Sequence, residues 1–247
     1  MTNQKSNDHI YGEFESLKFN YRRQKYREYT DFLEGSDHTK TEIIENIGAF
    51  VGDLTLNRLL TITEYFKLTN SIAGHIADVG TYKGASALLF AKLMKINNPE
   101  STWQVHGFDW FKGTPKVSEE DSKLVPEGGY KSSKDNLLEL VTLQNLESIL
   151  RLHDLDLITE LGEFFERHPH LQFRLVFMDA GLFEVMDSAI PQFWNRLAPG
   201  GIMVFDQLSH EFAPGEISAV RKNLPDEVLR TLPNSWMPNA YIKKGAS

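Results

Sequence analysis

One stretch, residues 75–86 with the sequence HIADVGTYKGAS, constrains the fold of this chain more than any other. A short apolar run leads into a turn bounded by Gly80 and Gly84, and an apolar helical pattern follows directly. This order indicates strand, glycine turn and helix. Such a unit begins a wound α/β sheet, in which ligands bind beyond the carboxyl ends of the strands. We therefore expect a ligand at the glycine turn; a turn that needs glycine only for its backbone geometry is the alternative.

The rest of the pattern extends this unit into one α/β domain. Strands are predicted over 75–79, 103–108, 148–152, 175–178, 202–205, 227–232 and 239–244, with a turn at 199–201 and the last two strands as an antiparallel hairpin. Helices are predicted over 13–33, 41–47, 55–68, 85–96, 135–141, 158–167, 183–197 and 217–223. We expect residues 1–54 to be an N-terminal helical segment with a disordered start, which caps the sheet, and residues 55–247 to be the α/β domain.

The composition is that of an ordinary globular protein, with 41% hydrophobic and 24% charged residues. No apolar run approaches the roughly 20 residues of a membrane span, and we see no export signal, so a cytoplasmic protein is expected. The absence of cysteine excludes disulfides, zinc–thiolate sites and thiol nucleophiles. A net charge of −8 disfavours a nucleic-acid partner. The basic cluster at 21–27 favours a helix face or a contact in a homo-oligomer over a polyanion site.

Aspartates follow three of the predicted strands. Asp109, Asp179 and Asp206 each come directly after an apolar run, while Asp78 lies inside the first strand. One such aspartate is readily explained as a helix N-cap. Three at successive strand ends instead favour a ligand site on the rim of the sheet.

The chemistry of these residues points to an adenosyl cofactor. A carboxylate at Asp109 can accept hydrogen bonds from the two hydroxyls of a ribose. The spacing from Gly80 to Gly84 departs from the Gly-x-Gly-x-x-Gly pattern that places a pyrophosphate on a helix N-terminus. The carboxylate of Asp78 would repel a pyrophosphate but suits an ammonium group. We therefore favour S-adenosylmethionine, which has a ribose, an ammonium group and no phosphate, over a nicotinamide cofactor and an NAD-dependent oxidoreductase.

Three segments carry a family resemblance: IAGHIADVGTYKGASALLFAKL (72–93), VHGFDWFKGTP (105–115) and LVFMDAGLFEVMDSAIPQFWNRLAPGGIMVFDQL (175–208). They resemble class I S-adenosylmethionine-dependent methyltransferases, and more narrowly the macrocin O-methyltransferase family, which methylates sugar hydroxyls on natural products. The resemblance implies a Rossmann-like sheet of seven strands whose last hairpin is antiparallel. It also implies cofactor contacts from Asp78, Gly80, Tyr82, Gly84, Ser86, Asp109 at the ribose, Trp110 along the adenine and Asp154 near the adenine amine.

The same resemblance implies a divalent cation, usually Mg²⁺, held by an aspartate at position 179 and two at 206 and 207. This chain keeps Asp179 and Asp206 but has Gln207, which offers a carbonyl oxygen and one negative charge fewer. Some family members have a carboxylate, proposed as a base, where this chain has Gly181. We expect a cation of reduced affinity at Asp179, Asp206 and Gln207.

Methyl transfer requires an acceptor hydroxyl that is held near the methyl group and loses its proton. A cation at the rim would lower the pKa of that hydroxyl. His210, four residues after Asp206, is the candidate general base. Asp179 itself could serve if no metal binds, and His153 is a weaker candidate that would reach the same rim.

The polar loop at 112–132 contains Tyr130 and is expected to close over the acceptor; a disordered loop is the alternative. The predicted function is O-methylation of a hydroxyl on a sugar or another small-molecule acceptor. The alternative is a fold relative, hydroxylase-like or non-catalytic, that binds an adenosyl cofactor without methyl transfer.

Overall fold

Seven strands form one sheet in the computed structural model, which describes residues 13–233 and 235–245. The strands are β1 (His75–Val79), β2 (Val105–Asp109), β3 (Leu150–Asp154), β4 (Phe173–Met178), β5 (Leu197–Phe205), β6 (Leu229–Arg230) and β7 (Ala240–Lys243). The disordered start predicted for the chain lies outside the described residues.

The order of the strands across the sheet is β3-β2-β1-β4-β5-β7-β6. Strands β1 to β5 are parallel, whereas β7 runs antiparallel to both β5 and β6. The direction of the strand order reverses between β1 and β4, and in open α/β sheets a ligand crevice lies beyond the carboxyl ends at that point. The predicted α/β class with a reversed last hairpin is confirmed.

Two strands differ from the prediction in ways that matter for the site. Strand β5 begins at Leu197, so the turn predicted at 199–201 lies inside the strand, where its register with β4 shifts. Strand β3 continues to Asp154, two residues beyond its predicted end, and this places His153 within the strand.

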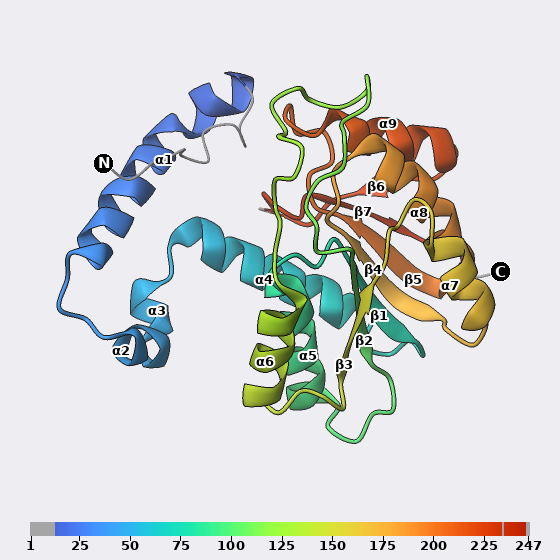
Figure 1. Ribbon diagram of the computed structural model, residues 1–247, viewed down its shortest axis with the longest axis horizontal. Helices are drawn as coiled ribbons and strands as arrows, with labels where there is room; N and C mark the ends of the chain where they lie inside the picture. The colour runs from blue at the N-terminus through green and yellow to red at the C-terminus, as the bar shows by residue number, and fades with distance from the viewer. Residues whose placement is uncertain (1–12, 234, 246–247) are drawn as a thin grey trace.

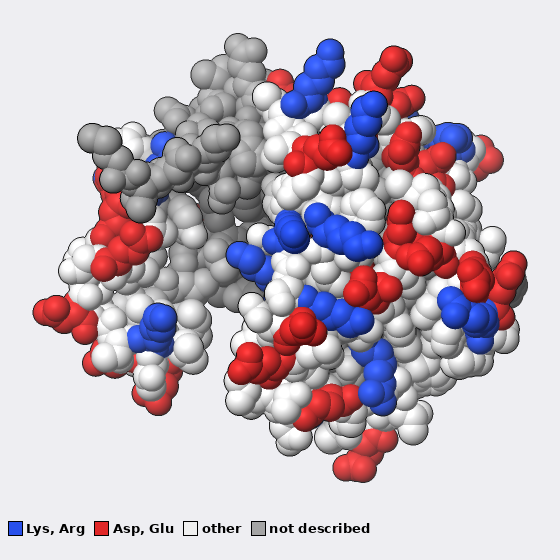
Figure 2. Space-filling view, in the orientation of Figure 1, with Lys and Arg blue, Asp and Glu red and all other residues white. Residues whose placement is uncertain are grey.

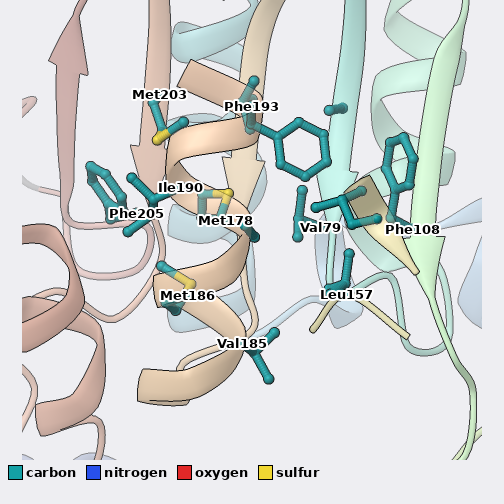
Figure 3. Packing of buried hydrophobic residues seen from close by; sticks show 14 of the residues in the cluster. Val79, Phe108, Leu157, Met178, Val185, Met186, Ile190, Phe193, Met203 and Phe205 are labelled. Carbon is teal, nitrogen blue, oxygen red and sulfur yellow. The ribbon is translucent and has the colours of Figure 1, made fainter. Parts of the chain in front are cut away.

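Helices cover both faces of the sheet (Figure 1). They are α1 (Glu13–Glu34), α2 (Lys40–Glu45), α3 (Ile47–Phe50), α4 (Asp53–Leu68), α5 (Ala85–Asn97), α6 (Lys134–Leu143), α7 (Leu161–Arg167), α8 (Phe183–Arg196) and α9 (Pro214–Asn223). Side chains alternate between the faces of a strand, so Phe177 packs with α4, α5 and α6 while its neighbour Met178 packs with α7, α8 and α9. Figure 3 shows the second core, where Phe193 of α8 faces Phe108 and Val79 of the sheet.

The N-terminal helices divide into a packed part and a projecting part. Helix α4 buries one side on the sheet, through Thr61, Ile62, Tyr65 and Phe66. Helices α2 and α3 bury no residue, and Figure 1 shows α1, α2 and α3 extending away from the sheet on one side. Helix α4, which the prediction placed almost wholly in the α/β domain, covers the sheet, whereas α2 and α3 of the predicted cap bury no residue.

Acidic and basic side chains are interspersed on the face drawn in Figure 2. Within the basic cluster at 21–27, the side chains of Arg22 and Arg23 lie outside the described part of the chain. Across the residues that the structure describes, no helix has the length and apolar character needed to cross a bilayer.

Candidate functional site

A cavity of about 600 Å³ opens at the carboxyl ends of β1, β2, β4 and β5. Its volume lies in the range of small-molecule sites. Seven of the residues predicted for the site line it: Gly80, Tyr82, Asp109, Trp110, Asp179, Asp206 and Gln207. The three aspartates predicted at strand ends therefore line one cavity.

The two glycines of the turn after β1 lie against different neighbours, which leave no room for a Cβ. Gly80 has φ +90°, and a Cβ there would lie 2.3 Å from the backbone oxygen of Asp179. Gly84 has φ +82°, and a Cβ there would lie 2.4 Å from Cδ1 of Leu137 on α6. Gly80 lines the cavity and Gly84 does not. Backbone geometry and packing account for Gly84, and its cofactor contact stays a prediction.

Asp109 is held at the end of β2 by two backbone amides. Its Oδ2 accepts a hydrogen bond from Tyr82 N and its Oδ1 accepts one from Phe111 N, each at 2.7 Å. Both donor residues have left-handed backbones, with φ of 51° and 58°, and such strain persists where surrounding contacts enforce it. Burial raises the pKa of Asp109, while the two amides counteract the rise. Each oxygen keeps a lone pair, as a pair of ribose hydroxyls requires.

Asp78 is fully buried behind the turn and does not line the cavity. Neither of its carboxylate oxygens has a hydrogen-bond partner. Burial raises the pKa of Asp78 to about 6; the hydroxyls of Ser86 and Thr81, which lie near the carboxyl group without meeting hydrogen-bond geometry, oppose the rise. A buried carboxylate without a partner is costly, which fits a site completed by a ligand cation.

The remaining predicted cofactor residues lie at different depths. Trp110 lines the cavity, and its indole N–H donates to the backbone oxygen of Gly113. Ser86 is buried in α5 outside the cavity wall. Asp154 is exposed, ion-pairs with Lys134 at 3.7 Å and lies outside the cavity wall.

On the other side of the cavity, two carboxylates share one guanidinium. Arg58 of α4 donates from Nη2 to Oδ2 of Asp179 at 2.8 Å and from Nη1 to Oδ1 of Asp206. Gln207 donates from Nε2 to Asp179 Oδ1 and to Asp206 Oδ2, both at 3.4 Å. We call Asp179, Asp206, Arg58 and Gln207 the rim cluster. Adjacent parallel strands bring the two aspartates together, because Asp179 N donates to the backbone oxygen of Val79 and Asp206 N donates to that of Met178.

The electrostatics of the rim cluster follow from its burial. Burial raises the pKa of Asp179 well above its usual value; the carboxylate of Asp206 raises it further, and Arg58 opposes both. Burial by itself would lower the pKa of Arg58, but Asp206 and Asp179 raise it overall. Burial also raises the pKa of Glu216 on α9, which accepts a hydrogen bond from Gln207 N. The raised pKa makes Asp179 a better proton acceptor than an ordinary exposed carboxylate.

The three residues expected to hold a divalent cation do lie together, but their geometry does not fit one. The carboxylates of Asp179 and Asp206 already pair with Arg58, and Gln207 turns its N–H donors toward them. Among the described residues, no group of three or more His, Asp or Glu side chains is arranged to hold a metal ion.

The two histidines predicted as bases differ in position. His210 is buried against Phe212 and Trp236, which line the cavity, although His210 itself does not. His153 lies outside the cavity wall, with its Nε2 2.9 Å from Nδ1 of His106. The prediction that His153 reaches the rim is not supported, because β3 continues past it.

His153 belongs to a row of three histidines on neighbouring strands. Nε2 of His106 lies 3.3 Å from Nδ1 of His75, so the rings of His75, His106 and His153 form a chain across β1, β2 and β3. We call these three the histidine row. The ring of His153 also stacks on Phe108, with centroids 4.7 Å apart.

The loop at 112–132 has no regular secondary structure but is anchored. Asp121 accepts hydrogen bonds from Phe183 N at the start of α8 (2.8 Å) and from Ser118 N (2.9 Å). Tyr130 lines the cavity and meets Tyr82 edge to face, with centroids 5.7 Å apart. The described loop is therefore placed over the cavity, where a lid would lie.

Arg58 and Glu216 were not predicted as site residues. Arg58 continues the buried stripe of α4, since it precedes Thr61 and Ile62 by three and four positions. A charged residue on the buried side of a helix needs a buried partner of opposite charge. That spacing was the available signal for Arg58. Glu216 gives no comparable signal.

A family model described as a methyltransferase domain matches residues 77–208. A comparison with curated proteins finds no significant match.

Three solved structures share the fold. A crystal structure of CalS11, a calicheamicin methyltransferase, aligns with a TM-score of 0.80 at 22% identity over 90% of this chain and 92% of that chain. The apo structure of CalS11, described as a TDP-rhamnose 3'-O-methyltransferase, aligns with a TM-score of 0.72 at 22% identity over 90% and 94%. The O-methyltransferase NovP aligns with a TM-score of 0.60 at 16% identity over 77% and 80%. At these identities the likeness shows the fold alone.

Proposed function

Since the chain belongs to the methyltransferase family whose model matches residues 77–208, as a class I S-adenosylmethionine-dependent enzyme, we propose that it methylates a hydroxyl group of a sugar or a similar small molecule. The observation that carries the proposal is one cavity with two different carboxylate environments. Asp109 stands on one side with two backbone donors, and Asp179 stands on the other with raised pKa. One side suits a cofactor and the other an acceptor.

The cofactor half would be formed by the turn after β1 and the end of β2. Asp109 accepts from the ribose hydroxyls, Gly80 allows close approach to the backbone, and Trp110 offers its ring to the adenine. Asp78, buried behind the turn and outside the cavity wall, stays a predicted contact of the ammonium end of the same molecule. The roles of Tyr82, Gly84, Ser86 and Asp154 stay predictions. When bound, S-adenosylmethionine supplies an electrophilic methyl group.

The acceptor half needs a group that takes the hydroxyl proton. A sugar hydroxyl is weakly acidic, so a base positioned at the cavity wall contributes about 10²- to 10⁴-fold to the rate. We assign this role to Asp179, because it lines the cavity and burial has raised its pKa. His210, the first candidate from the sequence, becomes the second, because it lies behind Phe212 and Trp236 and does not line the cavity. No divalent cation enters the proposal, because Arg58 holds both carboxylates.

The acceptor class is supported by the structural neighbours. CalS11 carries the printed description of a TDP-rhamnose 3'-O-methyltransferase and NovP that of an O-methyltransferase. A nucleotide-linked or glycosidic sugar is therefore the first acceptor class to test. A cytoplasmic location, the lack of a nucleic-acid partner and homo-oligomerisation stay predictions.

The test combines binding and product analysis. Calorimetry with S-adenosylmethionine is compared for the wild type, Asp109→Ala and the exposed matched control Asp154→Ala. We expect Asp109→Ala to weaken binding about 100-fold, because two ligand hydrogen bonds are lost and two strained amides are left unpaired. Asp154→Ala should change binding by less than about threefold.

Mass spectrometry then follows a 14 Da gain on a panel of TDP-sugars, glycosides and phenols. Methylation of a sugar hydroxyl would support the proposal. Cofactor binding with no methylated product would instead favour the alternative of a fold relative that binds the cofactor without methyl transfer. Equal weakening by both variants would contradict the role of Asp109.

A further inference from the structure

Donors from the protein engage every oxygen of the two carboxylates in the rim cluster. Arg58 donates to Asp179 Oδ2 and Asp206 Oδ1, and Gln207 donates to Asp179 Oδ1 and Asp206 Oδ2. Each of the four oxygens thus receives one N–H donor. A divalent cation could bind here only by displacing the donors of Arg58 and Gln207. Its ligands would then be the carboxylates of Asp179 and Asp206, next to the amide of Gln207.

Gly181 makes this arrangement possible. It has φ +66°, and a Cβ at this position would lie 2.7 Å from Oε1 of Gln207. The amide of Gln207 therefore lies against Gly181, with its oxygen toward the glycine and its nitrogen toward the carboxylates. The two departures from the family pattern, Gly181 and Gln207, fit each other.

Arg58 is held from the protein side rather than reaching in from solvent. Its guanidinium carbon lies 5.6 Å from the ring centroid of Phe177 on β4, and 23% of its side chain is exposed. Helix α4 fixes its origin through the packing of Thr61 and Ile62. The guanidinium is thus a preorganised cation that directs one Nη donor toward each carboxylate.

We infer that Arg58 takes the place of a divalent cation at Asp179 and Asp206, so that this enzyme transfers methyl groups without a metal ion. The inference rests on the proposed function. Arg58 acts as a positioning residue: its charge holds the two carboxylates side by side, with Asp179 at the cavity wall. Helix α4, from the N-terminal side of the chain, is consequently part of the catalytic site.

The first experiment measures metal binding and needs no acceptor. Mn²⁺ is titrated into the wild type, Arg58→Ala, Arg58→Lys and the matched control Arg167→Ala, and free Mn²⁺ is followed by electron paramagnetic resonance. Arg167 is an exposed arginine that pairs with Glu163 at 3.7 Å. We expect no stoichiometric binding to the wild type, Arg58→Lys or Arg167→Ala up to millimolar Mn²⁺. Arg58→Ala should gain one site, because two neighbouring carboxylates lose their cation.

The second experiment measures methyl transfer with EDTA and with added Mg²⁺. The wild-type rate should differ by less than about twofold between the two. Arg58→Ala should lose about 100-fold from misplacement of the carboxylates, and Arg58→Lys should recover part of that loss. Thermal unfolding and S-adenosylmethionine calorimetry check that each variant is folded.

Stoichiometric Mn²⁺ binding by the wild type that Asp206→Ala removes would overturn the inference, as would a wild-type rate that EDTA abolishes and Mg²⁺ restores. If Arg58→Ala does not fold, the wild type and Arg58→Lys still decide between these outcomes. Failure of the proposed function appears separately, as absence of cofactor binding or of a methylated sugar.

Discussion

The rim cluster and the histidine row are two polar clusters on the same sheet with opposite properties. The rim cluster pairs opposite charges at a cavity wall, and burial raises the pKa of its Asp179. The histidine row lies outside the cavity wall, and burial lowers the pKa of His106 to about 2 and that of His153 to about 4. Its rings are therefore neutral at physiological pH, linked to each other and packed on aromatic side chains.

The difference teaches what separates a functional polar cluster from a structural one. Both contain titratable groups with shifted pKa values, so the shift by itself does not mark a site. Unlike the histidine row, the rim cluster carries charged side chains, lines a cavity and includes Arg58 from a helix distant in sequence. The histidine row links ring nitrogens to one another and lies outside the cavity wall.

The largest expected effect comes from comparing one substitution in each of the two clusters. Asp179→Asn should lower the rate of methyl transfer about 10³-fold, because the amide cannot accept the hydroxyl proton. The affinity for S-adenosylmethionine should stay within about threefold. His153→Gln in the histidine row should leave the rate within about twofold. Initial rates and calorimetry measure both quantities.

His210→Gln completes that comparison, since His210 is the other candidate base. A larger loss of rate for His210→Gln than for Asp179→Asn would transfer the role of base to the histidine. A comparable loss for His153→Gln would break the distinction between the two clusters.

A second test concerns the backbone beneath the rim cluster. Gly80→Ala should lower the free energy of unfolding by about 3 kcal/mol, because the new Cβ meets the backbone oxygen of Asp179 and the backbone has positive φ. Gly84→Ala is the matched control, with a similar φ but a flexible Leu137 side chain as its neighbour; about 1–2 kcal/mol is expected. Urea unfolding measures both. Equal losses would show that only the φ strain counts.

Much of this molecule was predictable because the signals are local. The glycine turn, the alternating core and the aspartate after each strand involve neighbouring residues, so Asp109, Asp179 and Asp206 were placed on the rim correctly. A parallel sheet then brings adjacent strand ends together without further information.

The rest depended on contacts between distant parts of the chain. Arg58 lies 121 and 148 residues from its two partners, and nothing local pairs them. His153 was expected near the rim because the predicted strand ended at residue 152. Strand β3 in fact ends at Asp154, so His153 lies inside it, and a side chain within a strand faces a surface of the sheet rather than the rim. The sequence likewise did not show that Gln207 donates hydrogen bonds to the two aspartates, because that depends on which groups surround them in the folded chain.

The smallest expected effect is the pH dependence of stability from the histidine row. The pKa values of His106 and His153 in the folded protein, about 2 and about 4, lie below the ordinary value of 6.5. The unfolded chain therefore binds more protons below pH 6.5. The stabilising contribution is complete above that pH, and it falls by about 1.4 kcal/mol per pH unit for each histidine as the pH drops toward the folded values.

The raised pKa values of Asp179 and Glu216 act in the opposite direction, because these carboxylates bind protons more readily in the folded state. A variant isolates the histidines from that background: His106→Gln keeps a hydrogen-bonding side chain and should flatten the loss between pH 6.5 and 5.5 by about 1 kcal/mol. His38→Gln, at an exposed position, is the matched control. Urea unfolding at each pH measures the difference, and parallel pH profiles for the wild type and His106→Gln would contradict a neutral, buried histidine row.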